Sequence, residues 1–166
     1  SLQLPLETCE TLNGSWGFNI KDDRFKSVKS VIHYLVNAAG RNANLLLNVG
    51  PMPNGKIQTE FSDTLEKVGK WLTLHGQSIY GTRGGPAPPQ DWGVVTSKDK
   101  KIFVHILKYP EQDSLPVPGI RGTVERCYQM DGGRKISFKQ EGDHLILDLS
   151  TGLPDPLDTI IEIETR

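Results

Sequence analysis

The chain has 166 residues, of which 36% are hydrophobic and 23% are charged, proportions typical of a globular protein with a buried core. These values exclude a disordered or collagen-like chain. The 19 basic and 20 acidic residues leave a formal net charge of −1, which creates no field to attract phosphates, so we expect no nucleic-acid partner. No apolar run approaches the roughly 20 residues of a membrane-spanning helix, so we expect no membrane partner either.

The first eighty residues alternate between expected strands and expected helices. Residues 4–11 have strand character, and the spacing of apolar residues predicts a helix over 27–39, with Gly40 as its C-terminal stop. The short apolar run 44–49 predicts a strand buried on both faces, and 60–75 predicts a second helix. This order is typical of a parallel sheet covered by helices. Two such units cannot close a sheet, so we expect the chain to begin inside a larger domain.

A stretch rich in glycine and proline, residues 84–90, marks a change of pattern. The region 91–166 contains short segments with strand character separated by turn signals, which favours a small antiparallel β-sandwich. Glycine-containing hairpin turns are expected at 131–133 and 141–143. Strands are expected at 101–107, 136–138, 145–149 and 160–164.

Ligand sites of parallel α/β proteins lie at the carboxyl ends of the strands, and Glu7, Glu10 and Trp16 fall in that region of the sequence. Trp16 lies in a polar loop, where an aromatic face suits the apolar patches of a sugar; packing in the core explains it equally well. For Glu7 a catalytic carboxylate and an inward-pointing, hydrogen-bonded carboxylate remain open alternatives. Cys9 and Cys127 form no disulfide framework, and with the four histidines they give no metal-ligand or nucleophile motif.

Five motifs over residues 4–83 carry a resemblance to a known family. They are Leu6-Glu7-Thr8-Cys9, Ser15-Trp16-Gly17-Phe18-Asn19, Asn44-Leu45-Leu46-Leu47-Asn48-Val49-Gly50-Pro51, Gly69-Lys70-Trp71-Leu72 and Ser78-Ile79-Tyr80-Gly81-Thr82-Arg83. In this order and at this spacing they resemble the C-terminal part of the α-L-fucosidases of glycoside hydrolase family 29.

The resemblance implies an α/β plus all-β fold, with the last βα units of a TIM-like barrel followed by a small antiparallel β-sandwich. Residues 1–83 would be the end of the catalytic barrel, 84–90 a linker and 91–166 the sandwich. The family's reaction is retaining exo-hydrolysis of terminal α-L-fucose, without metal or cofactor. Its nucleophile and usual acid/base lie upstream of the residues present, so we expect the chain alone to be inactive.

The resemblance also implies partners and a compartment. The substrate would be a fucosylated glycan or glycoconjugate. The remainder of the barrel would come from the same or another chain. A secretory, periplasmic or lysosomal location is expected from the family.

Two site residues carry over from the family. Trp16 matches an aromatic residue that forms a wall against the methyl group of fucose. Glu7 matches a glutamate usually preceded by tryptophan, where this chain has Leu6, and we expect it to orient neighbouring groups rather than act as the acid/base. The segment 48–55 resembles the loop after the last barrel strand. The alternative is a carbohydrate-binding or structural β-sandwich module without catalysis, in which Trp16 and this loop would have no reason to be retained.

Overall fold

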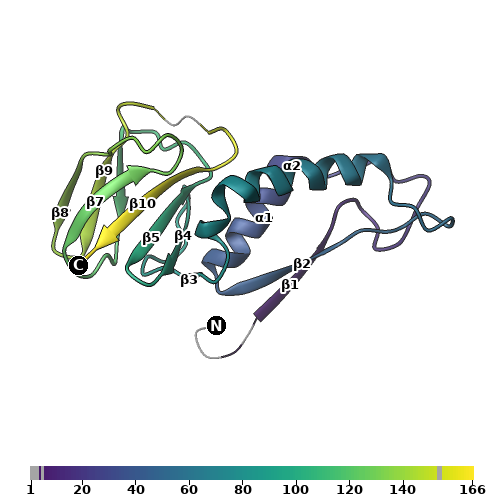
Figure 1. The fold of residues 1–166 in the computed structure, drawn as a ribbon, viewed down its shortest axis with the longest axis horizontal. Helices are drawn as coiled ribbons and strands as arrows, with labels where there is room; N and C mark the ends of the chain where they lie inside the picture. Colours follow the sequence, from purple (N-terminus) through teal and green to yellow (C-terminus); the bar gives the residue numbers. More distant parts are fainter. Residues whose placement is uncertain (1–3, 5, 153–154) are drawn as a thin grey trace.

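The computed structural model describes residue 4, residues 6–152 and residues 155–166. The N-terminal half forms two strand–helix units, and Figure 1 shows their helices lying between the first strand pair and the sandwich. Neither of the helices in the described residues is long and apolar enough to span a bilayer. The elements of this half are β1 (Leu6–Thr11), α1 (Val28–Gly40), β2 (Ala43–Asn48), α2 (Thr59–His75) and the short 3-10 helix η1 (Gly76–Ser78).

The strands β1 and β2 are parallel, as the sequence predicts, and pair in register from Leu6 with Ala43 to Thr11 with Asn48. Within the described residues they pair only with each other, so each keeps one free edge. The helices cover one face of this pair, and Leu47 packs into the core beneath them. Side chains alternate between faces along a strand, so only one set meets the helices. Among the described residues, no other element packs on the opposite face.

Both predicted helices are confirmed to within one residue, although the end of α1 differs from the expectation. Ser27 caps its start by accepting a hydrogen bond from Ser30 N at 3.1 Å. Gly40 is the last helical residue, and the left-handed backbone expected at Gly40 occurs instead at Asn42, where φ is 59°. Glycine is required at position 40 for packing, since a Cβ there would lie 2.5 Å from Val94 Cβ.

The C-terminal half is an antiparallel sandwich with sheets ordered β3-β4-β5-β10-β7 and β6-β9-β8. The predicted strands 101–107, 145–149 and 160–164 are confirmed, whereas that at 136–138 is wrong, because Ile136 is a buried residue before the strand begins at Phe138. The strands are β3 (Arg83–Gly84), β4 (Gly93–Lys98), β5 (Lys101–Ile106), β6 (Ser114–Val117), β7 (Val124–Gln129), β8 (Phe138–Glu141), β9 (His144–Asp148) and β10 (Thr159–Thr165). The glycines of both predicted hairpin turns have positive φ, as expected.

The five-stranded sheet is buried on both faces. One face carries Val104 and Ile161 into the core of the sandwich. The other carries Val94, Phe103 and Ile160 into a second core shared with α1 and α2. The helices are therefore a middle layer that is tied to the sandwich by apolar packing as well as by the chain connection at 84–90, whose role as a domain boundary stays a prediction.

A buried chain of hydrogen bonds also joins the helical layer to this sheet. His105 is fully buried, with Nδ1 2.7 Å from Asp158 Oδ2 and Nε2 3.1 Å from Thr96 Oγ1. The Thr96 hydroxyl donates its one proton to Ser78 O at 2.7 Å, so it accepts from the Nε2 proton of His105. The chain thus connects β4, β5 and the residue before β10 to the turn that follows α2.

Candidate functional site

The candidate site lies where β1 and β2 end side by side. Parallel strands have their carboxyl ends at one edge of the sheet, and the loops 12–27 and 49–58 leave from that edge together, as the far end of the β1–β2 pair in Figure 1 shows. The first loop closes on itself, because Lys26 N donates to Leu12 O at 2.8 Å. Leu12 N in turn donates to Asn48 O at 3.3 Å, which fastens the loop to β2.

Trp16 is carried by the first of these loops and is 56% exposed. The structure therefore excludes the alternative that its indole is packed in the core of this chain. The loop is held from both strand ends: Asn48 Nδ2 donates to Trp16 O at 2.7 Å, and Thr11 Oγ1 lies 3.2 Å from Ser15 O. An exposed aromatic side chain on a fixed backbone is suited to contact a ligand with its face.

Asp22 organises the same loop from within. Its carboxylate accepts hydrogen bonds from Gly14 N at 2.8 Å and Ser15 Oγ at 3.1 Å on one oxygen and from Arg24 N at 3.3 Å on the other. Burial raises the pKa of Asp22, but these hydrogen bonds and the Arg24 charge outweigh it and hold the pKa below its ordinary value. Asp22 is therefore a carboxylate that fixes the residues before Trp16.

The second loop approaches the first so closely that only glycine fits at the contact. A Cβ on Gly50 would lie 2.7 Å from Gly17 C and 2.9 Å from Phe18 N, both backbone atoms. Real Cβ atoms do not approach backbone so closely, and the backbone cannot move aside as a flexible side chain can. Gly50 thus fixes the separation of the two loops directly beside Trp16.

The uncovered face of the β1–β2 pair carries two parallel rows of side chains. From β1 the row includes Glu7 and Cys9, and from β2 it includes their register partners Asn44 and Leu46. All four are exposed, including Leu46 at 44%. Glu7 is not at the carboxyl end, where we expected it, because β1 extends four residues further to Thr11. At about 3.3 Å per residue, these four residues place Glu7 about 13 Å from the carboxyl end of β1.

Glu10 points to the other face, toward α1, and so is not among the groups of the site. Its Oε1 accepts from Thr11 N at 2.8 Å and lies 3.2 Å from Lys26 Nζ, and its carboxylate is also hydrogen-bonded by Tyr34. The hydrogen bond from Thr11 N is the main reason that the pKa of Glu10 lies below its ordinary value. Glu10 has a structural role, joining β1, the loop and α1.

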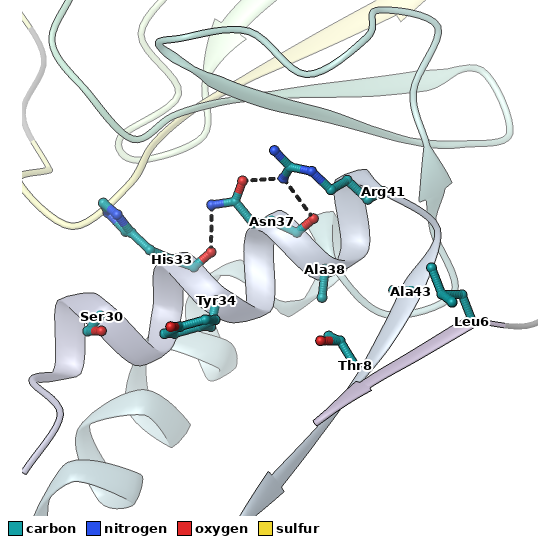
Figure 2. A pocket seen from close by; sticks show the side chains of 9 residues that line it. All are labelled: Leu6, Thr8, Ser30, His33, Tyr34, Asn37, Ala38, Arg41 and Ala43. Carbon is teal, nitrogen blue, oxygen red and sulfur yellow. Dashed lines mark hydrogen bonds between the residues drawn. The ribbon is translucent and has the colours of Figure 1, made fainter. Parts of the chain in front are cut away.

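A groove on the helical side of β1 is separate from the Trp16 loop. It has a volume of about 560 Å³, and Figure 2 shows Leu6 and Thr8 of β1 on one side, with Tyr34 of α1 and Arg41, the residue after α1, on the other. The groove runs along the free edge of β1, where backbone groups have no strand partner among the described residues. A free strand edge of this kind can pair with a further strand.

A cluster of polar side chains lies at the C-terminal end of α2. His75 is 3% exposed, its Nδ1 is 3.1 Å from Trp71 O, and its Nε2 is 2.7 Å from Asp131 Oδ1. Asp155 adds a carboxylate, and one ligand atom from each of His75, Asp131 and Asp155 lies within 4.8 Å of the others. The sequence analysis missed this cluster because its members are 56 and 24 positions apart. The cluster fastens α2 to the turn after β7.

Comparisons with known proteins agree with this geometry. Residues 1–77 match the family described as Alpha-L-fucosidase. Human plasma alpha-L-fucosidase is 29% identical over 119 residues, and the match covers 66% of this chain and 25% of that protein. Isoenzyme 1 of the Paenibacillus thiaminolyticus alpha-L-fucosidase has a solved structure that is 32% identical, with a TM-score of 0.88 over 98% of this chain and 40% of that one. The resemblance of this chain to the C-terminal part of α-L-fucosidases is thereby confirmed.

The structural similarity to solved α-L-fucosidases extends along nearly the whole chain. The alpha-fucosidase of Thermotoga maritima, solved in complex with fucose, is 26% identical and superposes with a TM-score of 0.81 over 97% of this chain. The predicted fold class, the last βα units of a TIM-like barrel followed by a β-sandwich, is thereby confirmed. The chain spans about a quarter of the curated relatives' length and about 40% of the solved chains.

Proposed function

We propose that the chain is the C-terminal part of a retaining α-L-fucosidase acting on terminal fucose of glycans or glycoconjugates. The observation that carries this proposal is the position of Trp16, an exposed indole on a loop held at the carboxyl ends of two parallel strands. Barrel enzymes place their active sites at this end of the strands. In this proposal Trp16 contributes an apolar wall for the methyl group of fucose.

The rest of the barrel, from the same or another chain, completes the fold in this proposal. Neighbouring strands add to the free edges of β1 and β2, and apolar side chains fill the groove between β1 and α1. The open face with Cys9 and Leu46 then becomes part of the barrel interior, which is packed with side chains in such folds. The nucleophile and the acid/base come from the upstream part, as in other retaining glycosidases that need two carboxyl groups.

We assign Glu7 a supporting role on the interior face, where it orients neighbouring groups. Glu7 lies near the start of β1, whereas Trp16 is in the loop that follows the end of this strand. The register partner of Glu7 on β2 is Asn44. In the enzyme extended upstream, Glu7→Gln is expected to lower activity, and added azide is expected not to restore it. Rescue by azide would show instead that Glu7 is the acid/base, because azide replaces the water that such a residue activates.

The proposal is tested by hydrolysis of an aryl α-L-fucoside. The 166-residue chain, shown by intact mass to be free of other polypeptides, is expected to be inactive, and the chain extended upstream through the rest of the barrel is expected to be active. Activity of the short chain would contradict the upstream placement of the catalytic carboxylates. Inactivity of the extended protein on every fucoside tested would favour a binding or structural module.

Trp16→Ala provides the matching test of the site. A contact with one methyl group is worth on the order of 1 kcal/mol, so kcat/KM of the extended enzyme for the fucoside should fall about fivefold. For the corresponding pentoside, the same ring with hydrogen in place of the methyl group, kcat/KM should hardly change. Since the indole is exposed, the melting temperature should also stay constant. An equal loss on both substrates would refute the methyl-wall role.

A further inference from the structure

We propose that Asn48, with Thr11, positions Trp16 and so sets the enzyme's preference for a sugar that carries the methyl group. The proposal rests on the proposed function and deepens it. Thr11 and Asn48 are the last register pair of β1 and β2, so each is anchored by its own strand immediately below the loop. Trp16 itself lies outside any regular element and depends on such anchors.

Asn48 Nδ2 forms two hydrogen bonds, one to Trp16 O and one to Thr11 Oγ1, which we call the clamp. Asn48 is the donor in both. The Trp16 carbonyl can only accept, so the group 2.7 Å from it must be the amide nitrogen of Asn48. The second proton of that nitrogen points to Thr11 Oγ1 at 3.1 Å. Thr11 keeps its own proton for Asn13 Oδ1 or Ser15 O, both 3.2 Å away. Both amide protons are therefore used, and no other side chain in the described residues donates to the Trp16 carbonyl.

A close backbone contact at Gly50 restricts the same loop from the side of the second loop. Gly50 follows Asn48 by two residues and lies close against the backbone of Gly17. Asn48 therefore holds the Trp16 carbonyl by a hydrogen bond, while Gly50 limits how far the following residue can move toward β2. A peptide held by a hydrogen bond on one side and by van der Waals contact on the next has little freedom to rotate. The exposed indole consequently projects in a defined direction without being packed in a core.

Asn48→Asp tests the clamp, because it keeps the size of the side chain and replaces the donor by an acceptor that repels the Trp16 carbonyl. Asn54→Asp is the matched control: Asn54 is exposed in the loop that follows Asn48, and its side-chain oxygen accepts from Lys56 N at 3.0 Å, which a carboxylate also does. Asn48→Ala is the second variant, removing the donor without adding a charge, in case the aspartate prevents folding.

Two measurements are made. In the 166-residue chain, amide hydrogen exchange at Gly14 and Ser15, whose N–H groups donate to Asp22 Oδ2 and Asn13 Oδ1 in the same loop, is expected to quicken at least tenfold in both Asn48 variants and to stay unchanged in Asn54→Asp. In the enzyme extended upstream, the ratio of kcat/KM for the aryl fucoside to that for the pentoside should fall about fivefold in the Asn48 variants. It should fall no further when Asn48→Asp is added to Trp16→Ala, because the group that Asn48 positions is then absent.

The outcomes separate this inference from the proposed function. Unchanged exchange in both Asn48 variants, or a substrate ratio equal to that of the unsubstituted enzyme, overturns the positioning role. A fivefold loss that persists in the Trp16→Ala background also overturns it, since Asn48 would then act by another route. Absence of fucosidase activity in the extended enzyme refutes the proposed function, while the exchange measurement still decides whether Asn48 holds the loop.

Discussion

Replacing Asp158 by asparagine should remove a large part of the stability of this chain. Asp158 and His105 are both 0% exposed, and the hydrogen bond between them is 2.7 Å long. The asparagine side chain could accept from His105 with its oxygen, but its amide protons would then occupy the place of Asp158 Oδ1, which has no hydrogen-bond partner among the described residues. Breaking a buried pair and burying an unpaired donor together cost about 3 kcal/mol.

For a chain of this size, each kilocalorie per mole lowers the melting temperature by about 2–4 °C, so Asp158→Asn should lower it by about 6–12 °C in a circular-dichroism melt. The matched control is Asp143→Asn, which removes an exposed ion pair with His144 of nearly equal length, 2.8 Å. It should change the melting temperature by less than about 2 °C. Equal, small shifts in both variants would refute the reasoning that burial makes the first pair important.

Two further predictions concern titratable groups. Burial raises the pKa of the Cys127 thiol to about 12, whereas Cys9 is exposed, so iodoacetamide at pH 8 should label one thiol per folded chain and two in denaturant; rapid double labelling of the folded chain would contradict this. The pKa of Glu10 is lowered chiefly by the hydrogen bond from Thr11 N, so its contribution to folding is complete above its ordinary pKa of 4.5 and is lost as the pH falls through the lower folded value. Glu10→Gln should therefore destabilise the chain in urea at pH 7 and much less at pH 3; the same loss at both values would exclude the carboxylate as the cause.

The strand–helix units could be predicted from the sequence because each element satisfies a local rule. Apolar residues at helical spacing mark α1 and α2, and Ser27, where the first predicted helix begins, caps α1 in the structure. The run that became β2 is short, apolar and bounded by turn residues, as strands of parallel sheets are. Gly40 does lie at the end of α1, as predicted. The reason for glycine there is its small size, which allows the contact with Val94, and not its ability to stop the helix.

The sandwich was predicted less completely because its central sheet is buried on both faces. Val94 and Val95 are both about 1% exposed although they point in opposite directions, so β4 lacks the alternation expected of a half-exposed strand. The short strand β6 contains Pro116, a residue that argues against a strand in the middle of a sheet but is tolerated at its edge. The layer of helices over the sandwich supplies the second buried face, and nothing local in β4 indicates it.

The candidate site also contains residues that a local sequence pattern can identify and residues that only the tertiary structure identifies. Trp16 could be selected from the sequence because a lone aromatic residue in a polar loop has no helical or strand pattern to explain it. Asn48 and Asp22 could not, since asparagine and aspartate are common in turns and their partners here depend on how two loops meet. Glu10 was grouped with the site by its position in the sequence and was separated from it only by the direction of its side chain.

In the proposed function, the Trp16 loop is fixed in place although the chain holds only part of the active site. Among the described residues, the contacts that hold Trp16 come from β1, β2 and their loops, so its position does not depend on further strands. Retaining hydrolysis needs, in addition, two carboxyl groups about 5 Å apart across the scissile bond. Glu10 is turned toward α1 and Asp22 is saturated by the loop that it organises, and neither can move into that position without releasing the structure that it holds. In the proposed function, the two carboxyl groups are supplied by strands that add to the free edges of β1 and β2. Binding of the methyl group and cleavage of the glycosidic bond would then be performed by separate parts of the barrel.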